Sequence, residues 1–372
     1  TCALPILHAL KRFGTAFGGY KMMENYPVPE CGPDDIILEI KAAAICGADM
    51  KHWGVDNGYD DTNITPDQQQ SVRGHEFAGE IVKVGENVKD WHIGQRVVSD
   101  NSAHVCGVCP ACEQGDFLCC EHKVNLGLDN NTWGGGFSKY CKVPGEILAI
   151  HKHAIWEIPE GIKYEEACVL DPICNAYKAV AQQSHLIPGQ DVVVFGTGPL
   201  GLFSVQVAKL MGAVNIVMVG LDDDVKVRFG VAKELGATHC VNGSKEDVVA
   251  RCTEICGRDN LGLVIECSGA NIALKQAIEM TRPNAEIVRV GMGFKPLEFS
   301  INDITAWNKS IIGHMAYDST SWRNCIRLLQ SGQIKVQPMI THRLGLSQWQ
   351  EGFDKMAKKE AIKVIFHYDY ED

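Results

Sequence analysis

The chain contains 372 residues, of which 45% are hydrophobic and 22% charged, and its 46 acidic and 35 basic side chains give a formal net charge of −11. This length is typical of two domains, and the composition excludes a disordered, collagen-like or repeat chain. The acidic balance disfavours nucleic acid and anionic membranes as partners, because binding to phosphates needs a concentrated basic face. No run of roughly 20 apolar residues predicts a membrane span, and no amino-terminal signal segment is recognised. We therefore predict a cytoplasmic protein.

Strand-like segments dominate the first part of the chain. Residues 35–45 form an almost continuous apolar run, and residues 76–84 alternate apolar and polar side chains before a turn at residues 85–87. Alternation over a short segment is typical of a half-buried strand, and the glycine and asparagine that follow favour a turn. We therefore expect a β-rich amino-terminal region.

Near residue 190 the pattern changes to short apolar strands that alternate with helices. Residues 191–195 and 215–219 are predicted strands, and the mostly apolar residues 200–211 between them are a predicted helix. Similar elements follow, with helices at residues 226–235 and 272–281 and strands at residues 263–267 and 286–290. This order predicts an α/β domain with a doubly wound parallel sheet covered by helices on both faces. The last patterned segments predict helices at residues 321–330 and 347–358 and a strand at residues 361–366.

Four closely spaced cysteines lie in a segment rich in turn-forming glycine and proline: Cys106, Cys109, Cys112 and Cys120. Their spacing allows four thiolates to close around one ion, and tetrahedral thiolate coordination is typical of structural zinc. Two alternatives stay open at this point. The thiols can be unrelated or form two disulfides, and an iron–sulfur cluster uses the same ligands. We leave out the adjacent Cys119 because it breaks the spacing.

A second candidate metal site combines residues that are distant in sequence. Cys46 follows the first apolar run, and His75 and Glu76 begin the alternating strand. Three protein ligands with a displaceable water are typical of catalytic zinc, which acts as a Lewis acid on a substrate oxygen. Asp49 is a candidate to accept the second ring N–H of His75 and so to orient the ring. From the residues alone, a structural histidine and a helix-capping aspartate remain alternative interpretations.

A glycine-rich turn follows the strand at residues 191–195 and begins the next helix. It carries three spaced glycines, with Pro199 and Leu200 before the last of them: Gly196, Gly198 and Gly201. Such a turn binds the pyrophosphate of a dinucleotide at the N-terminus of the helix. A βα turn with a purely structural role is the alternative.

Acidic residues follow the second strand of this unit slightly later than the usual spacing of a dinucleotide-binding fold. Asp222, Asp223 and Asp224 can hydrogen-bond the ribose hydroxyls, which favours NAD, whereas Lys226 and Arg228 can accommodate the 2′-phosphate of NADP. We predict NAD, with NADP as the alternative, and Asp222, Asp223 and Arg228 as candidate cofactor contacts. A solvated acidic helix start that complements the helix dipole explains the same aspartates without a cofactor.

Together and in this order, the motifs resemble those of the zinc-dependent medium-chain dehydrogenases, and within them the polyol (sorbitol) dehydrogenase-like branch. The resemblance covers nearly the whole chain and rests on the four spaced cysteines and on residues 46–49, 74–79, 134–138, 171–172, 196–201 and 234–237. It implies a GroES-like catalytic domain over residues 1–171, with a structural zinc lobe at about residues 100–122, and a Rossmann cofactor domain over residues 172–306. Residues 307–372 are expected to return to the catalytic domain.

The resemblance also implies the ligands of two zinc ions per chain. It makes Cys46, His75 and Glu76 ligands of the catalytic zinc and adds Asp171 as a further candidate. Members of the polyol branch usually have a glutamate at this last position. The shorter side chain of Asp171 either binds zinc directly or holds the zinc-bound water.

The expected proton relay departs from the family pattern. Ala48 stands where the family usually has a Ser or Thr, whose hydroxyl begins the relay, and a methyl group neither donates nor accepts a proton. His52 lies one residue after the usual relay histidine, so it is our candidate proton acceptor. A surface histidine or one that only contacts the cofactor is the alternative.

The implied activity is hydride transfer between a secondary alcohol of a polyol or sugar alcohol and NAD, with the ketose as product. Trp53, Tyr59 and Asn175 are candidates for the substrate pocket, although core packing explains such side chains equally well. Alternative substrates are threonine or another amino alcohol, and a sugar acid. A different class of function is a zinc-stabilised redox sensor that binds nicotinamide without catalysis. The family also implies a homodimer or homotetramer.

Overall fold

The computed structural model describes residues 7–12, 20–24, 26–53, 72–129, 133–293 and 295–370. The chain divides into two compact units, one formed by Thr1–Asp171 with Ile340–Asp372 and the other by Pro172–Met339. The first division falls after residue 171, at the expected position. The second differs from the expected boundary, because residues 307–339 belong to the second unit.

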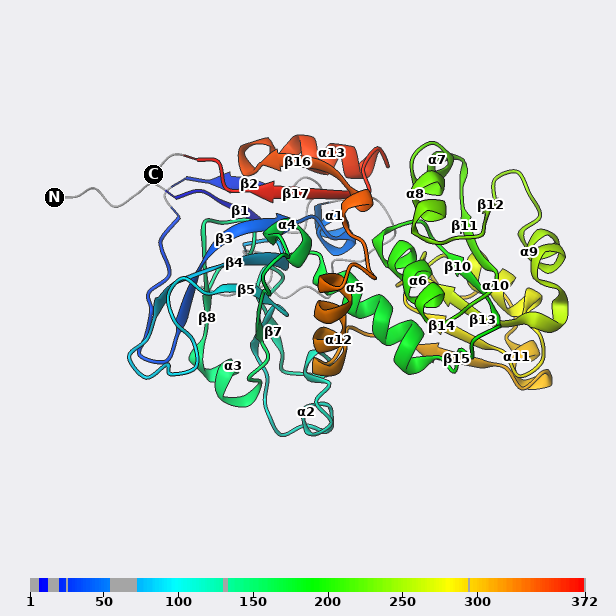
Figure 1. Cartoon of the computed structure of the whole chain (residues 1–372), viewed down its shortest axis with the longest axis horizontal. Helices are drawn as coiled ribbons and strands as arrows, with labels where there is room; N and C mark the ends of the chain where they lie inside the picture. The colour runs from blue at the N-terminus through cyan, green and yellow to red at the C-terminus, as the bar shows by residue number, and fades with distance from the viewer. Residues whose placement is uncertain are drawn as a thin grey trace. The chain divides into compact units, whose positions relative to one another are not determined.

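The first unit is built on a sheet of seven strands: β3 (Ile36–Ala44), β4 (Glu76–Val84), β5 (Arg96–Ser99), β8 (Tyr140–Val143), β9 (Ile155–Glu157), β16 (Ile340–Gly345) and β17 (Lys363–His367). Their order is β16-β17-β3-β4-β5-β9, with β8 also paired to β3. Strand β17 runs antiparallel to β3, so the end of the chain lies beside the strand that leads to Cys46 (Figure 1). The C-terminal segment thus returns to the first unit, as expected, but only from residue 340.

Shorter elements surround this sheet: the hairpin β1 (Ala9–Arg12) and β2 (Tyr20–Met23), the pair β6 (Ser102–His104) and β7 (Val124–Asn125), and the helices α1 (Gly47–Trp53), α2 (Pro110–Glu113), η3 (Phe117–Cys119), α3 (Gly145–Ile150), α4 (Tyr164–Ala167), η7 (Leu346–Gln348) and α13 (Trp349–Ala357). Helix α13 packs against β16 and β17. The ring of Phe353 on this helix packs edge-on against the ring of Phe137, with centroids 6.2 Å apart, and the centroids of Phe137 and Phe366 of β17 are 5.4 Å apart. Aromatic packing therefore fixes the C-terminal segment onto the sheet.

The second unit contains a six-stranded, fully parallel sheet: β10 (Asp191–Phe195), β11 (Ile216–Gly220), β12 (His239–Asn242), β13 (Leu261–Glu266), β14 (Glu286–Arg289) and β15 (Ser310–Gly313). The strand order is β12-β11-β10-β13-β14-β15. Every residue of β10, β11 and β13 is buried, as the central strands of a sheet covered on both faces must be.

Helices cover both faces of this sheet (Figure 1). In chain order, the helices of this unit are α5 (Leu170–Tyr177), which begins in the first unit, η4 (Lys178–Gln183), α6 (Pro199–Leu210), α7 (Asp222–Val225), α8 (Arg228–Leu235), α9 (Val248–Cys256), η5 (Arg258–Asn260), α10 (Asn271–Met280), α11 (Asn302–Ala306), α12 (Ser319–Gln330) and η6 (Gln337–Met339). Helix α6 packs with α8, and α9 packs with α10. The predicted α/β unit with a parallel sheet is confirmed.

Strand β15 explains the shifted boundary. It pairs in parallel with β14, with Ser310 opposite Glu286, and so extends the Rossmann sheet beyond residue 307. Its side chains are largely exposed at the sheet edge, so the segment lacks the long apolar run by which a strand is recognised in sequence.

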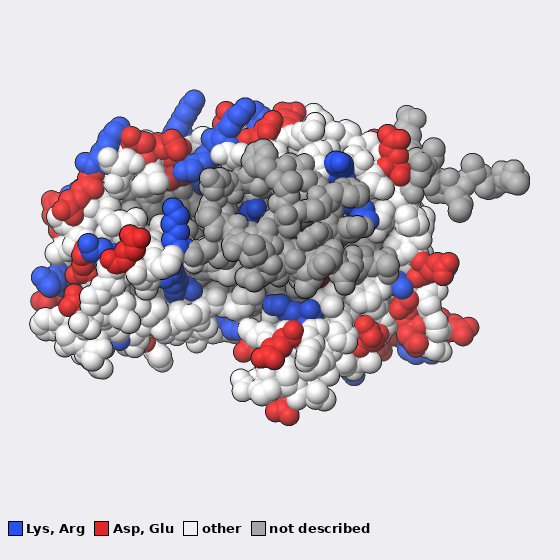
Figure 2. Space-filling model, turned by 180° about the vertical axis from the view of Figure 1, so that it is seen from behind, with Lys and Arg blue, Asp and Glu red and all other residues white. Residues whose placement is uncertain are grey.

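The described helices include none that is long and apolar enough to cross a membrane. On the face seen in Figure 2, Lys and Arg side chains are interspersed with Asp and Glu. The exclusion of nucleic acid and membranes as partners stays a prediction.

Candidate functional site

The structure brings Cys46, His75 and Glu76 together in the first unit. Cys46 follows the end of β3, and Glu76 begins β4 in register with Ala44, so two neighbouring strands place the three residues side by side. Their ligand atoms all lie within 4.8 Å of one another. His75 and Glu76 are buried, and the backbone before them turns through Gly74 with φ of +89°, a conformation that favours glycine.

Asp49 connects two members of this group. It is fully buried in the first turn of α1, and its Oδ2 accepts a hydrogen bond of 3.0 Å from the Cys46 backbone N–H. Its Oδ1 lies 3.7 Å from His75 Nδ1, which is longer than a hydrogen bond but close enough for the carboxylate to favour the Nδ1–H tautomer. That tautomer leaves Nε2 of His75 as the metal-binding atom.

The site attracts positive charge. Burial alone would lower the pKa of His75, but the neighbouring Cys46 thiolate and Asp49 carboxylate raise it well above its usual value. Burial also raises the pKa of the Cys46 thiol, and Glu76 raises it further. Acidic and thiol groups therefore outnumber cations at this point, which is the electrostatic requirement of a divalent metal site.

Lys363 lies beside these candidate ligands, and sequence analysis missed it. It lies in β17, is 1% exposed, and its Nζ contacts Glu76 Oε2 and donates to the Ile45 carbonyl at 3.1 Å. Burial lowers the pKa of Lys363, but Glu76 and Cys46 raise it more strongly, so the ammonium form is favoured. The sequence signal that could have revealed Lys363 is the position of a lysine inside the apolar run of residues 361–366.

Zinc fits the group of Cys46, His75 and Glu76. A thiolate, an imidazole and a carboxylate are donors that zinc accepts. Within the described part of the chain, Glu76 Oε1 is buried without a hydrogen-bond partner, while Oε2 contacts Lys363. The carboxylate can therefore offer Oε1 to a metal and keep its ion pair.

Asp171 does not join this group among the residues that the structure describes. Its Oδ2 lies 3.3 Å from the Asn101 side-chain amide, which donates to it, and Asn101 adopts a positive φ of 61°. Both roles expected for Asp171, direct ligation and holding the zinc-bound water, stay predictions.

The remaining candidate side chains belong to different units or lie outside the described residues. The ring centroids of Trp53 and Phe353 lie 5.4 Å apart, so Trp53 belongs to the core of the first unit. In the second unit, Asn175 Oδ1 lies 3.3 Å from His314 Nε2. Tyr59 and the His52 side chain lie outside the described residues. Lys51, one helical turn after Ala48, is half-buried, and burial lowers its pKa while Cys46 raises it.

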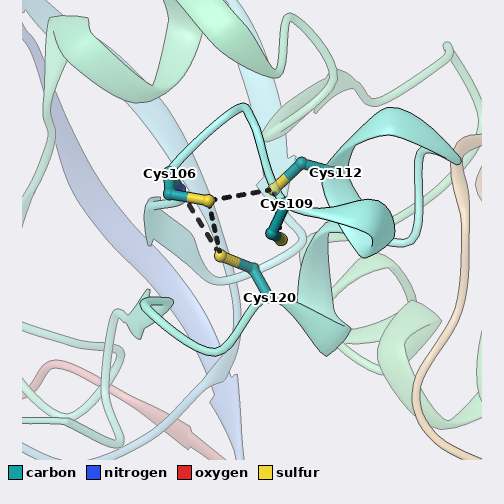
Figure 3. Close-up of side chains that lie close together, drawn as sticks. All are labelled: Cys106, Cys109, Cys112 and Cys120. Carbon is teal, nitrogen blue, oxygen red and sulfur yellow. Dashed lines mark hydrogen bonds between the residues drawn. The ribbon is translucent and has the colours of Figure 1, made fainter.

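The four spaced cysteines form a second group (Figure 3). They carry free thiols, with Sγ atoms 3.5 Å apart for Cys109 and Cys112, 3.6 Å for Cys120 and Cys106, and 4.0 Å for Cys106 and Cys112. A tetrahedral zinc with Zn–S bonds of about 2.3 Å places its sulfurs about 3.8 Å apart. The spacing fits one zinc ion, and the two-disulfide alternative is not what the structure contains.

Backbone N–H groups prepare this lobe for thiolates. The N–H groups of Val108 and Cys109 lower the pKa of Cys106 to about 6, whereas burial and the neighbouring thiols raise the pKa of Cys112. Four thiols at these distances cannot all ionise without a cation between them, so the lobe depends on a metal to hold its shape.

The glycine-rich turn has the form of a phosphate cradle. Gly196 adopts φ of +93° at the end of β10, and Pro199 begins α6. A Cβ on Gly201 would lie 1.8 Å from the Gly196 carbonyl oxygen, whereas a Cβ on Gly198 would meet no protein atom within 4 Å. Gly201 thus permits close packing of turn and helix, and Gly198 leaves open space that a dinucleotide phosphate can approach.

This contrast predicts different outcomes for two alanine variants. Gly201→Ala should lower the free energy of unfolding by about 1–3 kcal/mol, because the backbone must move to admit the methyl group. The variant should also lose NADH binding. Gly198→Ala should keep its stability but bind NADH about tenfold more weakly, because the methyl group occupies the phosphate position. Thermal unfolding and NADH fluorescence titration check both, and equal NADH affinity for Gly198→Ala and the unmodified protein would contradict the cradle.

The acidic segment after β11 separates into different roles. Asp222 is exposed and binds Asn242 Nδ2 at 2.6 Å and Lys245 Nζ at 3.2 Å, and these hydrogen bonds lower its pKa. Asp224 is buried, accepts from the Leu221 N–H at 2.8 Å and pairs with Arg228 at 3.5 Å. Arg228 is thus engaged by a carboxylate, which sequence spacing alone did not reveal.

Comparisons with known protein families agree with both units. Residues 32–153 match the alcohol dehydrogenase GroES-like domain, and residues 199–331 match the zinc-binding dehydrogenase domain. A metal group on the first and a dinucleotide turn on the second are typical of oxidoreductases that combine zinc with a nicotinamide cofactor. The chain belongs to the zinc-type alcohol dehydrogenase family, and it is a zinc- and NAD(P)-dependent enzyme of that family.

Curated relatives match along nearly the whole chain. An uncharacterized zinc-type alcohol dehydrogenase-like protein of Escherichia coli K12, YdjL, is 77% identical over 98% of this chain and 100% of its own. Sorbitol dehydrogenase of Halalkalibacterium halodurans is 30% identical over 93% and 95%, and L-threonine 3-dehydrogenase of Rhizobium rhizogenes K84 is 32% identical over 93% and 94%. These relatives differ in substrate, so they establish the family but not the alcohol.

Solved structures agree in fold and in cofactor class. The 2R,3R-butanediol dehydrogenase of Bacillus subtilis superposes with a TM-score of 0.82 at 28% identity, covering 98% of this chain and 100% of its own. A zinc-binding dehydrogenase of Sinorhizobium meliloti 1021 was solved with NADP, and a short chain alcohol dehydrogenase of Escherichia coli CFT073 with NADH. Both have a TM-score of 0.83 at 26% identity, cover 98% of this chain, and are covered over 100% and 99% of their own lengths.

Proposed function

We propose that the enzyme oxidises a secondary alcohol of a polyol or sugar alcohol to the ketose with NAD, and catalyses the reverse reduction. The observation that carries the proposal is the group of Cys46, His75 and Glu76, whose ligand atoms all lie within 4.8 Å of one another. The similarity of the whole chain to sorbitol dehydrogenase supports a polyol as the substrate. An intact set of three metal ligands argues against the redox-sensor alternative, which has no need of an open metal position.

When bound, zinc supplies Lewis-acid polarisation of the substrate hydroxyl, and the nicotinamide supplies the hydride acceptor. The chain's own residues position these partners. Asp49 orients the His75 ring, Lys363 holds one oxygen of Glu76, and the turn at Gly196–Gly201 receives the cofactor phosphates. His52, on α1 beside Lys51, is the proposed acceptor of the alcohol proton.

The choice of alcohol is tested by substrate turnover. We would follow NADH formation by the zinc-loaded enzyme with four- to six-carbon sugar alcohols, threonine, sugar acids and simple alcohols as separate substrates. Turnover of one polyol with a kcat/KM well above that of threonine supports the proposal. Preferred turnover of threonine or a sugar acid would replace the polyol, and NADH binding without turnover of any alcohol would favour the sensor.

NAD is proposed over NADP because the Asp222 carboxylate lies just after strand β11, where it can bind ribose hydroxyls and repel a 2′-phosphate. The Arg228 guanidinium, the group that could accept that phosphate, pairs with Asp224. Asp222→Asn should therefore lower the ratio of kcat/KM for NAD to that for NADP by about 100-fold, or about 2.7 kcal/mol. Glu234→Gln, an exposed change on α8, is the matched control and should leave the ratio unchanged. A wild-type preference for NADP would contradict the assignment.

A homodimer or homotetramer stays a prediction of the family resemblance. The edge strand β15 is the surface that fits it, because its Ile311 and the preceding Trp307 are exposed at 37% and 53%. Pairing between the β15 strands of two copies would join their two sheets into one and cover this apolar surface.

A further inference from the structure

Three backbone turns meet at the carboxyl ends of β10, β13 and β14. A Cβ on Gly196 would lie 3.0 Å from the Ser268 backbone N, and a Cβ on Gly291 would lie 2.2 Å from the Gly269 backbone N. No side chain fits between these turns. The carboxyl ends of parallel strands are where ligands bind in sheets of this kind, so the junction lies at the cofactor side of the Rossmann unit.

Glu266, the last residue of β13, holds the middle turn. Its side chain is fully buried, and its Oε1 accepts hydrogen bonds from the Ser268 N–H at 2.7 Å, the Ser268 hydroxyl at 2.5 Å and the Gly269 N–H at 2.9 Å. One carboxylate oxygen thereby fixes two consecutive residues of the turn. Gly269 has a φ of +73°, so the turn adopts a conformation that this carboxylate helps to hold.

Backbone hydrogen bonds connect the Glu266 segment to the other two turns. The Glu266 carbonyl accepts from the Val290 and Gly291 N–H groups, each at 2.8 Å, and the next residue, Cys267, donates its N–H to the Phe195 carbonyl at 2.9 Å. Phe195 directly precedes Gly196 of the glycine-rich turn. A displacement of the segment that contains Glu266 would therefore reach the phosphate cradle on one side and the Gly291 turn on the other.

The second carboxylate oxygen of Glu266 has no conventional hydrogen bond in the described chain. Oε2 is buried, and the nearest cation, Arg289 Nε at the end of β14, lies 3.8 Å away. Leaving a buried carboxylate oxygen with so little compensation costs stability. Burial of a carboxylate that is expensive for folding suggests a role beyond folding.

We propose that Glu266 is a positioning residue for the dinucleotide: it holds the Ser268–Gly269 turn, and through it the Gly196 and Gly291 turns, in the shape that receives the cofactor. This inference rests on the dinucleotide site described above. Glu266 does not contact the substrate in this assignment. Its removal should therefore change cofactor binding more than the turnover of the bound complex.

The test is Glu266→Gln, which keeps an oxygen for the three donors but removes the charge. We expect about tenfold weaker NADH binding by fluorescence titration, a similar rise in the KM for NAD, and a kcat at saturating NAD within about twofold of wild type. Glu286→Gln is the matched control, because Glu286 lies at the amino end of β14, away from the turns, and should leave NADH affinity unchanged. Circular dichroism and thermal unfolding report the folded state of each variant.

A merely structural role would lower the unfolding temperature of Glu266→Gln without changing the NADH affinity of the folded protein, and that result would overturn the proposal. If the variant does not fold, Ser268→Ala provides the second measurement, since it removes one donor to Oε1 and leaves the carboxylate in place. We expect about threefold weaker NADH binding for Ser268→Ala, and unchanged affinity would overturn the proposal as well. Wild-type protein that bound neither NADH nor NADPH would instead refute the cofactor site itself, so the two failures are distinguishable.

Discussion

Cys46→Ser is expected to retain one zinc ion per chain instead of two and to lower kcat/KM by about 1000-fold or more. The thiolate is the only sulfur ligand in the group with His75 and Glu76, and its loss leaves two ligands at a site that needs three. Lewis-acid stabilisation by zinc supplies several kcal/mol to the transition state, and each 1.4 kcal/mol lost is about a tenfold change in rate. Metal analysis and steady-state kinetics measure the two effects on the same sample.

The ion that remains should be held by the four-cysteine lobe. Cys112→Ser is the reciprocal variant, which should lose that second ion and lower the unfolding temperature, because the lobe has little other means of holding its shape. Cys119→Ser is the matched control: this exposed cysteine lies next to Cys120 but outside the group of four, so both zinc ions and full activity should remain. Two zinc ions and undiminished turnover in Cys46→Ser would refute the assignment of the catalytic ligands.

Local patterns predicted much of this architecture. The strand at residues 76–84 and the strand at residues 191–195 have the predicted bounds in the structure. The first was recognised by its alternation and the second by its short apolar run, and a glycine follows each strand. The four-cysteine lobe was recognisable for a similar reason. Its ligands lie within 15 residues of sequence, so spacing alone indicates that they can surround one ion.

Contacts between distant segments could not be predicted in this way. Lys363 and Glu76 are 287 residues apart, and nothing in either local pattern indicates that β17 returns beside β3. The edge strand β15 was missed because its exposed side chains lack an apolar run, and the end of the Rossmann unit was therefore placed too early. Arg228 was assigned to the cofactor from its position, whereas its pairing with Asp224 depends on how one helical turn is capped.

Lys363→Met is expected to destabilise the protein without bound catalytic zinc by about 3–5 kcal/mol, because it leaves the Glu76 carboxylate buried without its cation. The ammonium group is 1% exposed and Glu76 is fully buried in the ion pair, so water cannot replace the lost partner. Lys355→Met is the matched control, since Lys355 pairs with the exposed Glu360 at 3.3 Å and should lose less than about 1 kcal/mol. Equilibrium denaturation without added zinc gives both values.

The double variant Glu76→Gln/Lys363→Met separates the ion pair from the metal. If the cost of Lys363→Met comes from an uncompensated carboxylate, neutralising Glu76 should recover most of the lost stability, since both buried charges are then removed. Catalytic zinc affinity should nevertheless stay low, because the neutral side-chain amide introduced by Glu76→Gln is a weaker donor than the carboxylate oxygen Oε1. Recovery of stability without recovery of the metal would establish that Glu76 serves Lys363 through one oxygen and zinc through the other.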